Sequence, residues 1–161
     1  MKMLFLLLLM LSSLARAQST SSPDPFFARL QGEWRGEGTA FGTTAQVQQQ
    51  WAWQLGGKFL RLSLRYETKS KDGTTQVFEG HGYYQTKGGG KYLGRWFDSQ
   101  GNDYPINAQL EGEALVALWG GKVEGRSIYR LIELGNQMEA SDSIKQADGS
   151  WKDFSRFVLK R

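Results

Sequence analysis

The stretch from Lys58 to Lys69 most constrains the fold, because its side chains alternate between apolar and polar residues. The apolar face carries Leu60, Leu62, Leu64 and Tyr66, and the polar face carries Arg61, Ser63, Arg65 and Glu67. A period of two is that of a β-strand with one buried face, whereas an amphipathic helix repeats about every 3.6 residues. The Asp72-Gly73 pair that follows tolerates the positive φ of a tight hairpin. The stretch therefore predicts a half-buried strand leading into a hairpin.

The same strand-and-turn unit repeats along the chain. After a first strand starting near Glu33, strands are predicted at 44–54, 58–69, 74–86, 91–98, 104–111, 114–119, 122–134, 137–146 and 150–159. Short turns rich in Gly, Asp and Asn separate them, and no second helical pattern appears. We predict an all-β chain that forms a single antiparallel up-and-down β-barrel of about ten strands. A β-sandwich is the alternative, and glycines at 80, 82, 94 and 125 favour the barrel because they let strands bend.

The N-terminal residues predict an export signal. Lys2 precedes an unbroken apolar run at 3–11, and Ala15 and Ala17 provide the small residues that signal peptidase requires. The run is about half the roughly 20 residues that a membrane span needs. We therefore predict a signal peptide at 1–17, a disordered tether at 18–24 and a β-barrel domain at 25–161, exported to the periplasm or secreted.

Composition narrows the chemistry of the exported domain. The chain contains no Cys, which excludes disulfides, thiolate metal sites and a Cys nucleophile. Removal of the signal peptide lowers the net charge from +4 to +2, and no block of Lys or Arg remains to favour a nucleic-acid partner. The sequence has no Gly-x-Ser-x-Gly motif, the nucleophile elbow of many serine hydrolases. With a single His and no Cys, the chain also lacks the usual ligands of a zinc site.

A short helix is predicted just before the first strand. Asp24 would cap it, Pro25 would occupy its first position, and the segment would end at Leu30. Its apolar residues Phe26 and Phe27 would then plug one end of the barrel.

Three motifs resemble a known group of barrels. Gly32-x-Trp34 after a helical plug resembles the calycin signature, and the segments GEWRGEG, LGGKFL and YLGRWFDSQG are similar to an uncharacterised bacterial family of exported lipocalin-like barrels, a domain of unknown function. The first segment is more distantly similar to the haem-binding nitrobindins. The resemblance implies that Gly32 and Trp34 are structural and that a C-terminal Arg, Arg156 or Arg161, stacks on the indole.

The resemblance does not carry a haem site over to this chain. Nitrobindins bind the haem iron through a His in the last strand, and here that strand reads DFSRFVLKR. We predict no cofactor and no bound metal.

Side chains on the middle strands are the candidate ligand site. The residues are Trp51, Trp53, Leu62, Leu64, Tyr66, His81, Tyr84 and Trp96. Barrels of this size can hold one small ligand, and Tyr and Trp add polar atoms to an apolar wall. The face that points inward at 79–84 is ambiguous, because Gly and aromatic residues occur on both.

Two further chemistries remain open. Arg61 and Arg65 could hold a carboxylate if their face points inward, although the Leu face is the better core. A pair among Glu33, Glu37, Glu79, Asp98 and Asp103 could serve glycoside hydrolysis.

Three functions compete at this stage. The leading prediction is a non-catalytic barrel that binds a small, largely apolar ligand in its interior. The alternatives are a structural or protein-interaction module with a filled core, as a monomer or a homodimer, and an enzyme that acts on a lipid or a sugar.

Overall fold

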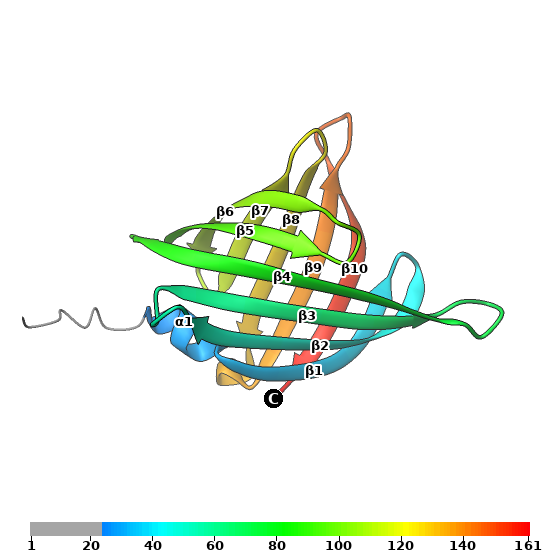
Figure 1. Cartoon of the computed structure of the whole chain (residues 1–161), viewed down its shortest axis with the longest axis horizontal. Coiled ribbons are helices and arrows are strands. Elements are labelled where there is room, and N and C mark those ends of the chain that lie inside the picture. Colours follow the sequence, from blue (N-terminus) through cyan, green and yellow to red (C-terminus); the bar gives the residue numbers. More distant parts are fainter. Residues whose placement is uncertain (1–23) are drawn as a thin grey trace, which may run out of the picture.

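A computed structural model describes residues 24–161, which form one closed antiparallel barrel of ten strands (Figure 1). The strands are β1 (Gly32–Ala40), β2 (Thr43–Gln54), β3 (Phe59–Lys69), β4 (Thr75–Gly88), β5 (Lys91–Asp98), β6 (Asp103–Glu111), β7 (Ala114–Gly120), β8 (Glu124–Ile132), β9 (Gln137–Lys145) and β10 (Trp151–Lys160). Each strand pairs with its neighbours in sequence, and β10 returns to pair with β1. The predicted fold class, strand number and meander topology are confirmed.

Closure of the barrel depends on the glycines of the first strand. In the β1–β10 register, Gly36 faces Leu159 and Gly38 faces Phe157. A Cβ at either glycine would overlap the backbone of β10, at the carbonyl of Val158 or of Arg156. Glycine is therefore required where the two terminal strands meet.

The helix α1 (Pro25–Leu30) closes one end of the barrel (Figure 1). Its N-cap is Asp24, whose carboxylate accepts the backbone N–H groups of Phe26 and Phe27. The same carboxylate accepts the hydroxyl of Tyr92 at 3.0 Å, which ties the helix to β5. Phe26, Phe27 and Leu30 are buried, so the predicted plug is confirmed.

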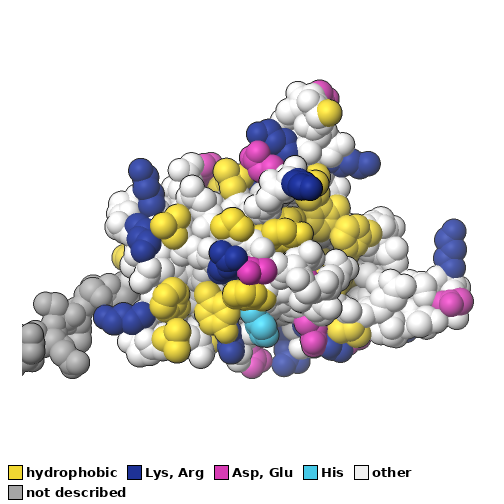
Figure 2. Space-filling view, turned by 45° about the horizontal axis from the view of Figure 1, so that its top comes forward, with side chains coloured by type: hydrophobic (Ala, Val, Ile, Leu, Met, Phe, Trp, Pro, Cys, Tyr) yellow, Lys and Arg dark blue, Asp and Glu magenta, His cyan; other side chains and the backbone are white. Residues whose placement is uncertain are grey.

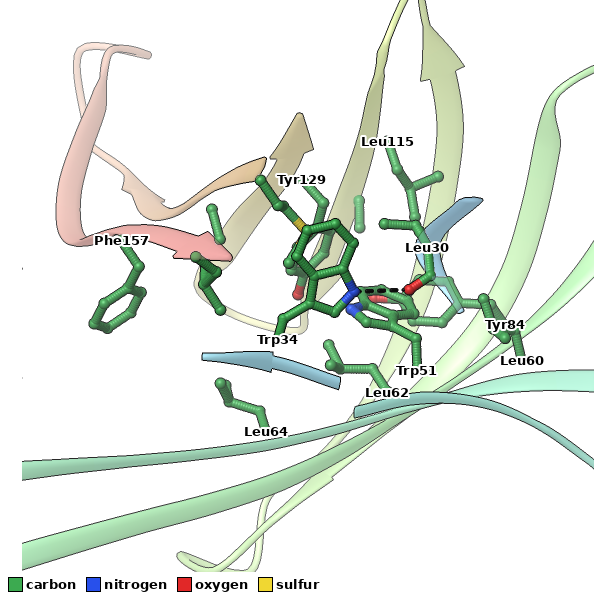
Figure 3. Packing of buried hydrophobic residues seen from close by; sticks show 14 of the residues in the cluster. Leu30, Trp34, Trp51, Leu60, Leu62, Leu64, Tyr84, Leu115, Tyr129 and Phe157 are labelled. Atoms are coloured by element: carbon green, nitrogen blue, oxygen red, sulfur yellow. Dashed lines mark hydrogen bonds between the residues drawn. The ribbon is translucent and has the colours of Figure 1, made fainter. Parts of the chain in front are cut away.

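Trp34 joins the plug to the barrel. Its indole is fully buried, and Nε1 donates to the carbonyl oxygen of Leu30 at 2.8 Å (Figure 3). The guanidinium of Arg161 lies 4.6 Å from the centre of the indole ring and also donates to the carbonyl of Arg29. Of the two Arg residues predicted to stack on the indole, Arg161 does so and Arg156 does not, because Arg156 is exposed and pairs with Asp153 at 2.7 Å.

The eighth strand is shorter than predicted. It ends at Ile132, and a single turn of 3₁₀-helix, η1 (Glu133–Gly135), follows. Glu133 and Leu134 have φ of 48° and 56°, which no strand accommodates.

Part of the predicted domain organisation falls beyond the described segment. The predicted signal peptide and positions 18–23 of the predicted tether lie outside it, and the last tether residue, Asp24, is the helix cap. Within residues 24–161, no helix is long and apolar enough to cross a membrane.

Candidate ligand-binding site

The half of the barrel away from α1 contains a cavity of about 290 Å³. This volume lies just below the range of roughly 300–1,000 Å³ that is typical of small-molecule sites. Its lining includes Phe41 of the β1–β2 turn and Gln100 of the β5–β6 turn, which lie at the end opposite the plug. The complete lining is Phe41, Leu64, Tyr66, Phe78, Tyr84, Trp96, Asp98, Gln100, Asn102, Tyr104, Ile106, Trp119, Ser127, Tyr129, Asp142, Ile144 and Phe154.

Two runs of aromatic rings in contact with one another form much of the wall. The first arc comprises Tyr66, Phe78 and Trp96, with ring centres 4.9 and 6.5 Å apart and nearly parallel planes. The second arc comprises Tyr104, Trp119, Phe154 and Phe41, whose successive ring centres lie 5.8, 6.5 and 5.0 Å apart. Each contact supports the next ring, so the wall is an organised aromatic surface.

Glycines on neighbouring strands position the two tryptophans of these arcs. Trp96 lies against Gly80, and Trp119 lies against Gly125, so closely that a Cβ at either glycine would overlap the indole. We predicted that these glycines permit strand bending. Their contacts give them a more specific task, which is to make room for the indoles inside the barrel.

Asp98 joins the two arcs through a saturated set of hydrogen bonds. Its carboxylate accepts Trp96 Nε1 at 3.1 Å, the backbone N–H groups of Gln100 and Asn102, and the Asn102 amide at both oxygens. Asn102 Oδ1 accepts the hydroxyl of Tyr104. Burial acts to raise the pKa of Asp98, but the donors from Asn102, Trp96 and Gln100 outweigh it and lower the pKa. Asp98 is therefore a stable carboxylate that fixes the β5–β6 turn.

Asp142 on β9 is a carboxylate in a different setting. Ser127 donates to it at 2.5 Å and Ser155 donates to its other oxygen, while Trp119 Nε1 donates to Ser127 at 2.9 Å. Burial raises the pKa of Asp142, a trend that the two serine hydroxyls oppose and that the charge of Asp153 reinforces. Among the described residues that line the cavity there is no Lys, Arg or His.

Two buried tyrosines separate the cavity from the packed half of the barrel. Tyr84 and Tyr129 both lie against Trp51, with ring centres 5.6 and 5.1 Å from its indole. Burial raises the pKa of each tyrosine well above that of a free phenol, and it raises the pKa of Tyr66 to about 12. These phenols are neutral at physiological pH, and all three residues line the cavity.

The structure divides the predicted ligand residues into three groups. Leu64, Tyr66, Tyr84 and Trp96 line the cavity. Trp51 and Leu62 are buried in the packed half around Trp34 (Figure 3), and Trp53 packs against Phe27 of the plug at 6.0 Å. His81 lies on the outer surface (Figure 2), which corrects its inclusion in an interior site.

The inward face at 79–84 explains where His81 lies. Gly80, Gly82 and Tyr84 are buried, so Glu79, His81 and Tyr83 project outward. The same reasoning applies to β3, where Arg65 pairs with Glu67 and Glu79 at 2.6 and 2.7 Å on the outside.

The other charged candidates follow the same division. Arg61 shares the outer face with Arg65, so the suggestion that these residues hold a carboxylate inside the barrel was wrong. Of the five candidate carboxylates, Glu33, Glu37, Glu79 and Asp103 are exposed, and Asp98 lines the cavity. Within residues 24–161, no group of three or more His, Asp or Glu side chains could hold a metal ion.

Sequence reasoning missed Asp142, Trp119, Tyr129 and Phe154 as lining residues. A signal for Asp142 was present, because alternation places it on the same strand face as Met138, Ala140 and Ile144. A carboxylate on an otherwise apolar strand face indicates a buried or functional acid.

Comparison with known proteins identifies the fold. Neither the models of protein families nor the curated proteins gave a match to this chain. Among solved structures, Rv2717c from M. tuberculosis is similar with a TM-score of 0.58 at 16% identity, over 87% of this chain and 99% of that one. A barrel described as EF1p2_mFAP2b bound to DFHBI follows with a TM-score of 0.48 at 13% identity, over 87% of this chain and 99% of that one. The redesigned β-barrel mFAP1 bound to DFHBI has a TM-score of 0.46 at 16% identity, over 86% of this chain and 100% of that one.

Proposed function

We propose that this protein is an exported, non-catalytic barrel that binds one small, largely aromatic or apolar ligand in its interior. The observation that carries the proposal is the cavity of about 290 Å³ between two aromatic arcs. Aromatic walls with a few fixed polar groups are typical of small-molecule sites. Tyr84, Tyr129 and Asp142 provide polar groups that would orient a bound molecule.

The two other functions have less support. A structural module with a filled core does not require a hollow of this size, since protein interiors are ordinarily close-packed. A glycoside hydrolase would require two available carboxylates. Asp98 is committed to Trp96, Gln100 and Asn102, which leaves Asp142 without an acid–base partner in the cavity.

Export and family membership are part of the proposal. The apolar run at 3–11 followed by Ala15 and Ala17 supports a cleaved signal peptide, and the Gly32-x-Trp34 signature supports membership of the lipocalin-like exported barrels. Expression of the full chain in a bacterium, followed by N-terminal sequencing of the periplasmic protein, tests the first point. A mature N-terminus at Gln18 supports export, and an intact Met1 in cytoplasmic protein contradicts it.

Binding is tested with a neutral probe of suitable size, tert-butylbenzene. Trp96 and Trp119 line the cavity, so intrinsic fluorescence should change saturably with one site per chain. Ile144→Trp should narrow the cavity and weaken binding, whereas Val158→Trp adds the same group at an exposed position on β10 and should not. An affinity unchanged in Ile144→Trp would place the ligand elsewhere and overturn the proposal.

A further inference from the structure

The charged side chains that line the cavity are acidic, whereas the net charge of the chain is positive. The chain has a formal net charge of +4, yet the described lining residues include Asp98 and Asp142 and no cationic side chain. Buried charges in proteins are usually paired, because removal from water disfavours an isolated ion. The described lining therefore presents two carboxylates and no cationic side chain to pair with either.

The two carboxylates differ in their remaining hydrogen-bonding capacity. A carboxylate can accept about four hydrogen bonds. Asp98 accepts donors from Trp96, Gln100 and Asn102 at both oxygens, so it is saturated. Asp142 accepts one serine hydroxyl at each oxygen, which leaves acceptor sites for a further donor. Because Asp142 lines the cavity, those sites are available to a bound molecule.

The aromatic walls also favour a positively charged ligand. The face of an aromatic ring is electronegative and attracts cations, most strongly for Trp. The first arc includes Trp96 and the second arc includes Trp119, so each arc contributes an indole to the cavity. A metal ion is a poor fit, because Ca²⁺ and Mg²⁺ require six or more oxygen ligands and most of this lining is aromatic.

We propose that the ligand of this cavity is a small organic cation, a substituted ammonium group on an apolar or aromatic body. The ammonium group lies near Asp142 and the apolar body lies between the two aromatic arcs. This inference rests on the proposed function and specifies the charge of the ligand.

The test compares two probes of the same shape, phenyltrimethylammonium and tert-butylbenzene, which differ by a positive nitrogen in place of a carbon. Titration of the purified mature protein at mildly alkaline pH, followed by tryptophan fluorescence and calorimetry, gives both dissociation constants. Phenyltrimethylammonium has no N–H to donate, so the comparison isolates the effect of charge. We expect the cation to bind at least about tenfold more tightly, through cation–π contacts and the attraction of the Asp142 carboxylate.

The outcomes separate the two proposals. Equal binding, or tighter binding of tert-butylbenzene, overturns the cation inference and leaves the binding function intact. Failure of both probes to bind overturns both. This comparison uses the unmodified protein, so it does not depend on the folding of any variant.

Asp142→Asn tests the position of the charge. It should remove most of the preference for the cation and leave the affinity for tert-butylbenzene unchanged. Glu139→Gln is the matched control, because it removes the same charge from the exposed face of the same strand and should change neither constant. A full preference retained in Asp142→Asn would show that the carboxylate takes no part and would overturn its assignment.

Discussion

Asp98 and Asp142 line the same cavity, yet their pKa values move in opposite directions. Burial opposes ionisation of both, but Asp98 has donors from Asn102, Trp96 and Gln100 that lower its pKa. Asp142 has only the hydroxyls of Ser127 and Ser155, and burial prevails. The first carboxylate stabilises its turn when ionised, whereas ionisation of the second disfavours the folded state. A destabilising group retained in a cavity is typical of a functional site.

The first prediction concerns the stability of Asp142→Asn as a function of pH. The pKa of Asp142 is higher in the folded than in the unfolded chain, where Asp titrates near 3.9. Its ionisation penalty is therefore absent below the unfolded pKa, develops between the unfolded and the folded pKa, and is constant above the folded pKa. The stability of the variant relative to the natural chain should be higher at neutral pH than below pH ~3.9, as measured by urea unfolding.

Asp148→Asn is a control for which stability should change with pH in the opposite direction. Hydrogen bonds from Ser150 lower the pKa of Asp148 in an exposed hairpin, so its stabilisation is present at neutral pH and disappears in acid. Its variant should lose stability relative to the natural chain as pH rises. The same slope in both variants would contradict the assigned environment of Asp142.

For a single residue, the sequence predicts whether the side chain points inward or outward only where the residue's own strand has a clear apolar face. Alternation could assign Arg65 to the outside because its own strand has a clear apolar face. It could not assign His81, because Gly80 and Gly82 on one side and Tyr83 on the other give no contrast in hydrophobicity. The inward face there is set by Trp96, a residue of the next strand that lies against Gly80 and Gly82.

At the scale of elements, the β1–β2 hairpin places an unusual residue at the mouth of the cavity. Phe41 and Gly42 form its turn with φ of 50° and 76°, and such turns prefer Asn at the first of these positions. The Phe41 ring instead stacks on Phe154 and lines the cavity. The strained backbone at Phe41 thus places its ring at the end of the second arc.

Phe41→Asn should separate these two effects. Relief of the strained φ gains up to about 1 kcal/mol, and loss of the stack costs about 0.5–1.5 kcal/mol, so stability should change little while probe affinity falls several-fold. Leu55→Asn is the matched control, since Leu55 has φ of 51° but is exposed in the β2–β3 turn at the plug end. It should gain stability without any change in binding. Equal binding by Phe41→Asn and the natural chain would exclude Phe41 from the site.

The pairing of glycine with indole gives a second prediction at this scale. In Gly80→Ala the new Cβ would displace Trp96 and its hydrogen bond to Asp98, which should cost about 1–3 kcal/mol, the usual range for overpacking. Gly121→Ala has open space and an ordinary φ, so its effect should stay within about 0.5 kcal/mol. Urea unfolding of both variants measures the difference, and equal effects would show that Trp96 relaxes without strain.

For the molecule as a whole, the sequence predicted the barrel but not which half is hollow. Strand number, order and the plug follow from local alternation, turn residues and capping. Leu62 and Leu64 belong to the same predicted core face, yet one is buried in the packed half and the other lines the cavity. That difference depends on how far side chains from all ten strands reach toward the axis, which no single strand determines.

The barrel consequently has two ends with separate tasks. The plug end contains the fully buried side chains of Phe27, Leu30 and Trp34, and it fixes the fold through the bond from Trp34 to Leu30. The other end has the cavity and the two arcs, and much of its inner surface lacks packed neighbours. Stability and binding should therefore respond to different substitutions.

The last prediction tests this separation. Leu30→Ala should lower the free energy of unfolding by about 2–5 kcal/mol, as loss of a buried Leu does, and should leave probe affinity unchanged because the cavity lies at the opposite end. Ile144→Trp should weaken binding with a smaller effect on stability. Since distant sites add within about 0.5 kcal/mol, the stability of the double variant should equal the combined effects. A weaker probe affinity in folded Leu30→Ala would show that the plug shapes the cavity, and the milder Phe26→Leu repeats the test if Leu30→Ala does not fold.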